Sequence, residues 1–204
     1  MSKLETLADA FHDELQDIYS AEQQIAKALP KMIKKANSGK LSQALTAHLE
    51  QTKLHVERVA SAFEETGKSA KAKKCEAMAG LIKEAEETMA QDADSDVADA
   101  ILIGLAQKVE HYEIATYGTL CTWADQLGYT NAKGLLGQNM DDEEKVDKLL
   151  SNLRRHANLA PQGIGHLRQN ECPSTRRFVG RTGLRCAIRC ETQHIRFRVC
   201  YQIN

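Results

Sequence analysis

Carboxylate and imidazole side chains recur three or four residues apart in four separate segments of the sequence. Residues at these intervals project from the same face of an α-helix, so each segment can direct its groups to one side. We predict six metal ligands in these segments: Glu22, His55, Glu110, Glu113, Glu143 and Asp147. His48 and Gln51 share the helix face of His55. We expect the carboxylates to face inward at the same depth as Glu22, which lies on the apolar seam of its own segment.

The chemistry that such a cluster could perform is the binding of hard cations. Five buried carboxylates would repel one another and lose hydration, so a metal-free cluster must hold extra protons or admit water. Cations remove this problem. Carboxylate-rich, histidine-poor sites inside four-helix bundles are typical of di-iron and di-manganese centres. We therefore predict a dinuclear site for iron or manganese.

The alternative is that these acids are solvated surface charges. This reading is strongest for Glu143, which lies within the acidic run 141–144. It is weaker for Asp147, which lies beyond that run. His12 and His111 lie beside the apolar seams. We expect them either to contact the ligating side chains without binding the metal or to be exposed.

Four long amphipathic helices are predicted to position the cluster. Apolar residues at intervals of three and four predict helices over 3–36, 38–66, 95–127 and 131–153. Gly67 and Gly128 are predicted to end the second and third of these helices. Pro30 should kink the first helix or open a second segment, because a proline inside a helix removes a backbone hydrogen bond.

The connection between the second and third helices is too long for a hairpin, and it contains a short predicted helix over 75–89. Two helical hairpins joined by a long crossover form the ferritin-like arrangement. We therefore predict an all-α fold, a ferritin-like four-helix bundle over 1–153 whose crossover carries an extra short helix.

Composition sets further bounds on the function. The chain has 204 residues, of which 42% are hydrophobic and 5% aromatic, and these values favour an α-rich domain. No apolar run approaches the length needed to span a bilayer, and the amphipathic N-terminus lacks a signal-peptide core. We expect a cytoplasmic protein without membrane association. Without an export signal, the six cysteines are not expected to form a disulfide framework.

The last 51 residues differ in kind from the rest. Residues 1–153 carry 17 basic and 26 acidic side chains, a balance of −9, whereas 154–204 carry ten arginines, no lysine and two acids, a balance of +8. We interpret 154–204 as an irregular Arg/Cys-rich tail, disordered or non-native through a shifted reading frame or a fusion. Weak, non-specific nucleic-acid binding is the functional alternative. A third reading is a zinc site, although its spacing departs from the usual CxxC knuckle: Cys186, Cys190, His194 and Cys200.

Three segments of the bundle resemble the YciE/YciF family of bacterial ferritin-like, stress-associated proteins. They read DIYSAEQQIAKALPK, LTAHLEQTKLHVERV and AQKVEHYEIATYGTLCTWADQLGY, and the resemblance covers about residues 3–153. It implies a ferritin-like fold, a homodimer and kinship with rubrerythrin-like di-iron proteins. It also implies the ligand positions on the first, third and fourth helices, at Glu22, at Glu110 with Glu113, and at Glu143 with Asp147.

The second helix departs from the family pattern. The family commonly has a glutamate where this chain has Gln51, four residues before His55. A neutral amide binds a hard cation more weakly than a carboxylate and does not bridge two ions in the same way. Two ions are expected, with one of the two positions in doubt because of Gln51.

Two functions follow from these observations. The first is a stress-associated protein whose dinuclear centre reacts with oxygen or peroxide, as a metal-dependent oxidoreductase would, with Tyr117 or Tyr19 passing electrons or hydrogen bonds. The second is a metal-free helical dimer that acts as a structural or interaction protein in the stress response. Gln51 favours the second.

Overall fold

The computed structural model describes residues 4–156, which form five α-helices and one short 3₁₀ helix. The helices are α1 (Leu7–Lys35), α2 (Gly39–Ala62), η1 (Phe63–Thr66), α3 (Glu76–Met89), α4 (Ser95–Leu127) and α5 (Thr130–His156). All four long helices and the short crossover helix predicted from the sequence are present. The predicted all-α fold class is confirmed.

Local chemistry sets the ends of α1. Thr6 caps its start through a reciprocal pair of bonds, in which the backbone amide of Asp9 donates to Thr6 Oγ1 at 3.1 Å and the amide of Thr6 donates to Asp9 Oδ2 at 3.2 Å. The helix continues through Pro30 to Lys35. The predicted alternative, that Pro30 opens a separate segment, is therefore wrong, because packing of the apolar seam on both sides outweighs one lost backbone bond.

The turns are also fixed by side chains. Ser38 caps α2, and Asp99 of α4 accepts hydrogen bonds from the backbone amides of Asn37 and Ser38 at 2.8 and 2.7 Å. The start of α4 is therefore tied to the turn between α1 and α2. Gly67 and Gly128 have φ angles of +66° and +75°, a left-handed conformation that favours glycine. Gly128 ends α4 as predicted, whereas α2 already ends at Ala62 and Gly67 ends η1, the 3₁₀ helix that follows it.

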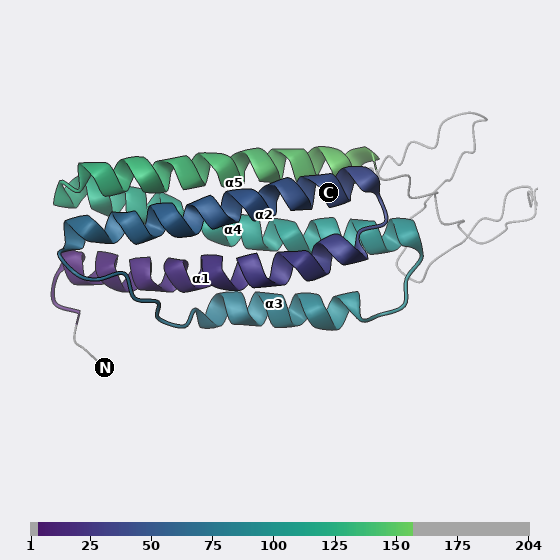
Figure 1. Ribbon diagram of the computed structural model, residues 1–204, viewed down its shortest axis with the longest axis horizontal. Helices are drawn as coiled ribbons and strands as arrows, with labels where there is room; N and C mark the ends of the chain where they lie inside the picture. The colour runs from purple at the N-terminus through teal and green to yellow at the C-terminus, as the bar shows by residue number, and fades with distance from the viewer. Residues whose placement is uncertain (1–3, 157–204) are drawn as a thin grey trace, which may run out of the picture. The chain divides into compact units, whose positions relative to one another are not determined.

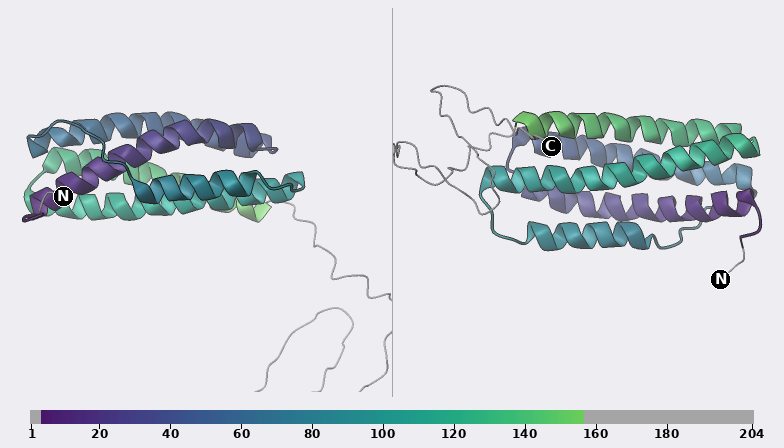
Figure 2. Two further views of the ribbon diagram at one scale, coloured as in Figure 1. Left: turned by 90° about the horizontal axis from the view of Figure 1, so that it is seen from below. Right: turned by 180° about the vertical axis from the view of Figure 1, so that it is seen from behind.

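The helices form two antiparallel hairpins joined by a crossover. Figure 1 shows α1 and α2 running in opposite directions, as α4 and α5 do, whereas α2 and α4 run in the same direction. In the bundle, α1 packs on α2 and α4, and α5 packs on the same two helices from the other side. The crossover returns along the bundle, and α3 packs against the outside of α1 and α4, as both views of Figure 2 show.

The core is apolar at both ends of the bundle and polar in its middle. Large side chains such as Phe11, Leu15, Leu41, Leu120 and Leu150 are almost fully buried. Between them lies a layer of fully or almost fully buried polar side chains: Glu22, His48, Thr52, His55, Glu110, Glu113, Asn139 and Glu143. Buried charged groups are costly unless they are paired or bind metals, so this layer requires an explanation.

The end of α5 lies at His156, slightly beyond the predicted boundary at 153. The predictions for the rest of the tail concern 157–204 and lie outside the described residues. These are its irregular structure, its nucleic-acid binding and its zinc site. Among the helices that the structure describes, none is long and apolar enough to cross a membrane.

Candidate metal centre

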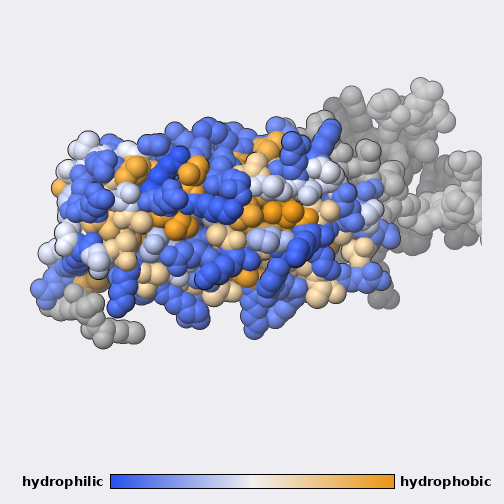
Figure 3. Space-filling model, viewed as in Figure 1, coloured by the Kyte–Doolittle hydropathy of each residue, from blue (hydrophilic) through white to orange (hydrophobic). Residues whose placement is uncertain are grey.

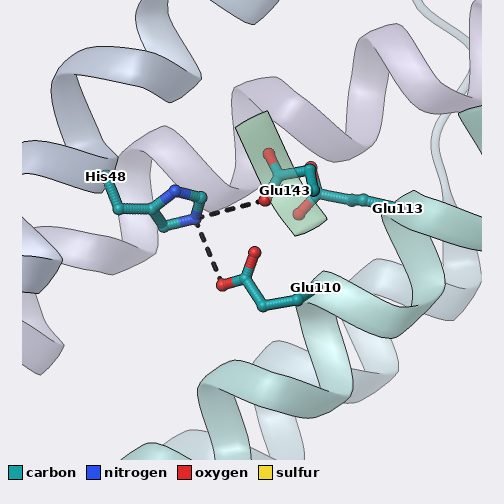
Figure 4. A group of neighbouring side chains, drawn as sticks. All are labelled: His48, Glu110, Glu113 and Glu143. Atoms are coloured by element: carbon teal, nitrogen blue, oxygen red, sulfur yellow. Dashed lines mark ion pairs between the residues drawn. The ribbon is translucent and has the colours of Figure 1, made fainter. Parts of the chain in front are cut away.

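The polar layer brings together residues from all four long helices. One group consists of His48 from α2, Glu110 and Glu113 from α4, and Glu143 from α5, and one ligand atom of each lies within 4.8 Å of the others. Figure 4 shows these four side chains converging on one point. His48 Nε2 lies 3.3 Å from Glu110 Oε1 and 4.0 Å from Glu143 Oε2.

A second group adjoins the first and shares one residue with it. Glu22 from α1, His55 from α2 and Glu143 again offer ligand atoms within 4.8 Å of one another. His55 Nδ1 lies 2.9 Å from Glu143 Oε1 and 3.3 Å from Glu22 Oε1. Because Glu143 belongs to both groups, its two carboxylate oxygens can serve two adjacent positions.

These six side chains are short of hydrogen bonds. In the described part of the chain, twelve buried side-chain nitrogen and oxygen atoms lack a hydrogen-bond partner, and ten of them belong to Glu22, His48, His55, Glu110, Glu113 and Glu143. None of the ion pairs above is a hydrogen bond: the contact between His48 and Glu143 is too long, and the geometry of the others is unfavourable. Buried polar atoms in folded proteins are normally satisfied. The lone pairs of these residues thus face one another as they would around a cation.

The two groups differ in the protonation of their side chains. Burial would lower the pKa of His55, but its contacts with Glu143 and Glu22 raise it to about 10, so this imidazole carries a proton at neutral pH. Burial would raise the pKa of Glu143, but contacts with Glu110 and His55 hold it below its usual value. The second group is therefore an ion pair of one cation with carboxylates.

In the first group, three of the four side chains favour their uncharged forms. Burial, together with the charge of Glu143, raises the pKa of Glu110 well above its usual value. Burial and the charges of Glu143 and Glu22 do the same to Glu113. Burial also lowers the pKa of His48, which favours its uncharged form. A metal ion there would replace the protons of two acids.

A hydrogen-bond network supports the Glu22 side of the cluster. The hydroxyl of Tyr117 donates to Glu22 Oε1 and accepts a bond of 3.0 Å from Asn139 Nδ2. Arg58 donates from Nη1 to Asn139 Oδ1 and Asp142 Oδ2, both at 3.0 Å. Such neighbours fix the orientation of ligating carboxylates. Of the two tyrosines singled out in the sequence, Tyr117 is the one that hydrogen-bonds to a member of the cluster.

Other residues singled out in the sequence lie farther away. Tyr19 and His12 both pack edge-on against Phe63, with ring centroids 5.9 and 5.5 Å apart. His111 is exposed, and its Nε2 lies 3.1 Å from Asp147 Oδ1. We predicted either a supporting or an exposed position for His12 and His111. Of these alternatives, His111 takes the exposed one.

The structure brings five of the six predicted ligands together and leaves Asp147 outside both groups. Asp147 accepts a hydrogen bond of 2.7 Å from Gln107 Nε2 and is partly exposed. The spacing from Glu143 places it on the same helix face, but four residues advance a helix by about 6 Å along its axis. That advance carries Asp147 past the cluster to a surface contact with α4.

The sixth member of the cluster is His48, which the predicted ligand set omits. The available signal was its spacing, since it lies two helical turns before His55 on the same face of α2. Thr52, fully buried, fills the turn between the two histidines, and its hydroxyl donates to the carbonyl of His48 at 3.0 Å. Gln51 is only partly buried. Both groups thus form without a carboxylate at position 51.

A four-helix bundle with a long crossover and a central layer of histidine and carboxylate side chains is the architecture of ferritin-like proteins. Residues 6–160 match a family described as a domain of unknown function, DUF892. The chain belongs to this family. It is 46% identical over 151 residues to protein YciF of Escherichia coli K12, covering 74% of this chain and 91% of that protein. The resemblance inferred from the sequence is confirmed.

Solved structures agree with this assignment. The crystal structure of the E. coli stress protein YciF superposes with a TM-score of 0.73 at 44% identity, covering 76% of this chain and 98% of that one. YcfI of Rhodopseudomonas palustris, described as a candidate structural protein, gives 0.71 at 46% identity, covering 73% and 95%. A two-domain Anabaena variabilis protein with a ferritin-like domain gives 0.51 at 17% identity, covering 84% and 42%. The last likeness concerns the fold alone.

Proposed function

We propose that this chain is a stress-associated ferritin-like protein that holds two ions of iron or manganese among α1, α2, α4 and α5. The single observation that carries the proposal is the set of ten buried ligand atoms without hydrogen bonds. Carboxylate oxygens with a few imidazole nitrogens suit these two metals. Iron or manganese bound there would supply redox chemistry toward dioxygen or peroxide.

The clustered side chains would form two adjacent metal-binding positions. Glu22 and His55 serve one position, and His48, Glu110 and Glu113 serve the other. Glu143 is common to both groups and would be shared by the two positions, so Gln51 would not be needed for that role. The hydroxyl of Tyr117 holds the carboxylate of Glu22 in place. The apolar residues above and below the layer keep water out and strengthen its electrostatic interactions.

Metal stoichiometry tests the proposal directly. The full-length protein is stripped with a chelator, loaded anaerobically with Fe(II) or Mn(II), desalted and analysed for metal. We expect two ions per chain. Glu143→Gln should remove most of the bound metal because the substituted residue belongs to both groups. Glu144→Gln is the matched control, since Glu144 is the next residue and its side chain is 44% exposed.

The proposal fails if the wild-type protein retains no more metal than Glu143→Gln. It also fails if the exposed control loses as much metal as Glu143→Gln, because the binding would then come from surface acids. Circular dichroism on all three proteins verifies that the bundle is intact.

A second candidate is a metal-free homodimer that acts through partner contacts. On the face shown in Figure 3, hydrophobic side chains form small patches among hydrophilic ones. Two of the exposed large hydrophobic residues, Leu54 and Leu149, lie on neighbouring helices α2 and α5. A protein that sediments as a dimer and retains no metal after loading would favour this second function.

A further inference from the structure

A narrow apolar cavity of about 30 Å³ lies among α1, α3 and α4. Its wall includes His48 and Glu110, which are 1% exposed and belong to the candidate metal centre. Its wall also includes Lys31 and Glu86, exposed residues that pair at 2.6 Å across α1 and α3. The cavity therefore extends from the protein surface to the His48 side of the centre.

The chemistry of the wall restricts what can pass. Apart from the two inner and two outer residues, every lining side chain is aliphatic or a methionine. Representative residues are Ile25, Ala28, Ile82, Ala85, Leu105 and Ala106. A metal cation or hydrogen peroxide would lose its hydration there without gaining hydrogen bonds. A small apolar molecule would lose nothing comparable.

The cavity is large enough for a small molecule. A cavity of about 10–15 Å³ holds one water molecule. The 30 Å³ found here therefore admits a diatomic gas. The crossover helix α3 lies outside the four-helix bundle and covers this side of α1 and α4. Its role here is to form one wall of the cavity.

We propose that dioxygen reaches the candidate metal centre through this cavity, which runs between α1, α3 and α4. This inference rests on the proposed function and narrows it, because it selects dioxygen over hydrogen peroxide as the oxidant. His48 and Glu110 are the residues that an arriving molecule meets first.

Xenon binding tests the cavity without any metal. Xenon occupies dry apolar cavities, and methyl NMR of the metal-free full-length protein reports its position. Xenon should shift the methyl signals of Ile25, Met32 and Ile82 but not that of Ile18, which is buried elsewhere in the core. The absence of any response among the lining methyls would overturn the proposal.

Blocking variants test the route. Ala28→Phe fills the cavity from α1, and Ile82→Phe fills it from α3, in case the first variant disturbs packing. Ala26→Phe is the matched control, since Ala26 is a partly buried alanine on the same helix that does not line the cavity. The blocking variants should abolish the xenon shifts, and the control should keep them.

The same variants, loaded with Fe(II), are then mixed with dioxygen or with hydrogen peroxide. The blocking variants should slow oxidation by dioxygen about tenfold, with iron stoichiometry and oxidation by peroxide unchanged. Equal slowing with both oxidants, or none with dioxygen, would overturn the route while leaving the metal centre intact. Failure of the wild-type protein to bind iron would instead overturn the proposed function, and with it the role of dioxygen.

Discussion

The two halves of the central cluster differ in how the negative charge of their carboxylates is balanced. In the half around His55, a protonated imidazole lies within 3.3 Å of the carboxylates of Glu22 and Glu143, and Tyr117 donates to Glu22 from behind. In the half around His48, burial lowers the pKa of the imidazole and raises the pKa values of Glu110 and Glu113 well above their usual values, so all three groups favour their uncharged forms.

The comparison shows that a buried acidic cluster can be balanced either by an internal cation or by protons. The His55 half contains its own positive charge and is already arranged as an ion pair. The His48 half has no cation of its own in the metal-free protein, and any proton on Glu110 or Glu113 would have to leave before that carboxylate could bind a metal. Substitutions at matched positions should therefore have different consequences in the two halves.

The largest difference is expected between the two histidines of α2. In metal-free protein, His55→Leu leaves the charges of Glu22 and Glu143 without their cation and should lower the free energy of unfolding by about 3–5 kcal/mol. His48→Leu removes an uncharged ring and should cost about 1 kcal/mol. Urea titrations in the presence of a chelator measure both values. Equal losses would show that the two halves do not differ in charge.

The next effect is a dependence on pH. The folded protein keeps the His55 proton up to a pKa of about 10, whereas the unfolded chain releases it near 6.5. Metal-free protein should therefore lose stability as the pH rises from 6.5 to 10, since the unfolded state binds fewer protons there. The raised pKa values of Glu110 and Glu113 act in the same direction.

Thermal unfolding of metal-free protein across this pH range provides the measurement. In His55→Leu the dependence that comes from the imidazole should disappear. A midpoint that rises with pH in the wild-type protein would contradict the assignment of charges to the two halves.

A smaller effect is expected from the network behind Glu22. Tyr117→Phe removes the hydroxyl that donates to Glu22 and accepts from Asn139, and leaves Asn139 with one partner fewer. The free energy of unfolding should fall by about 1–2 kcal/mol. Tyr19→Phe serves as the control, because the ring of Tyr19 packs against Phe63 away from the cluster. Similar losses in the two variants would mean that Tyr117 contributes only packing.

The smallest effect is expected at Asp147. Because it is partly exposed and bonded to Gln107, Asp147→Asn should change stability by about 0.5 kcal/mol or less. Metal stoichiometry should stay at the wild-type value. Loss of one ion per chain in this variant would restore Asp147 to the ligand set and place the cluster one turn farther along α5.

The sequence predicted the fold well because its evidence was local. The apolar spacing, the glycines at 67 and 128 and the length of the crossover each determine one element or one turn. The sequence singled out five members of the buried cluster for the same reason, since residues such as Glu110 and Glu113 lie three apart on one helix face. Of the two alternatives predicted for Pro30, a separate second segment was wrong because tertiary packing, which a local pattern does not contain, keeps α1 continuous.

The differences between the predicted ligand set and the observed cluster concern the level of each residue along the helix axis. Spacing states which face a residue occupies, but not which residue of a neighbouring helix lies at its level. Asp147 and His48 both satisfied the face criterion. Only His48 lies at the level of the cluster. The level of each residue depends on how far α2, α4 and α5 are shifted along their axes relative to one another, and this shift depends on the turns and on side-chain packing across the bundle.

The division of the cluster between the two hairpins has a consequence for how the chain assembles. The first hairpin supplies Glu22, His48 and His55, and the second supplies Glu110, Glu113 and Glu143, so neither contains a complete group. During synthesis the first hairpin emerges with its histidines and one acid before the second exists. Repulsion among the carboxylates is thus postponed until the hairpins dock. A metal bound at the proposed centre would then be captured late, and it would stabilise docking without guiding the formation of either hairpin.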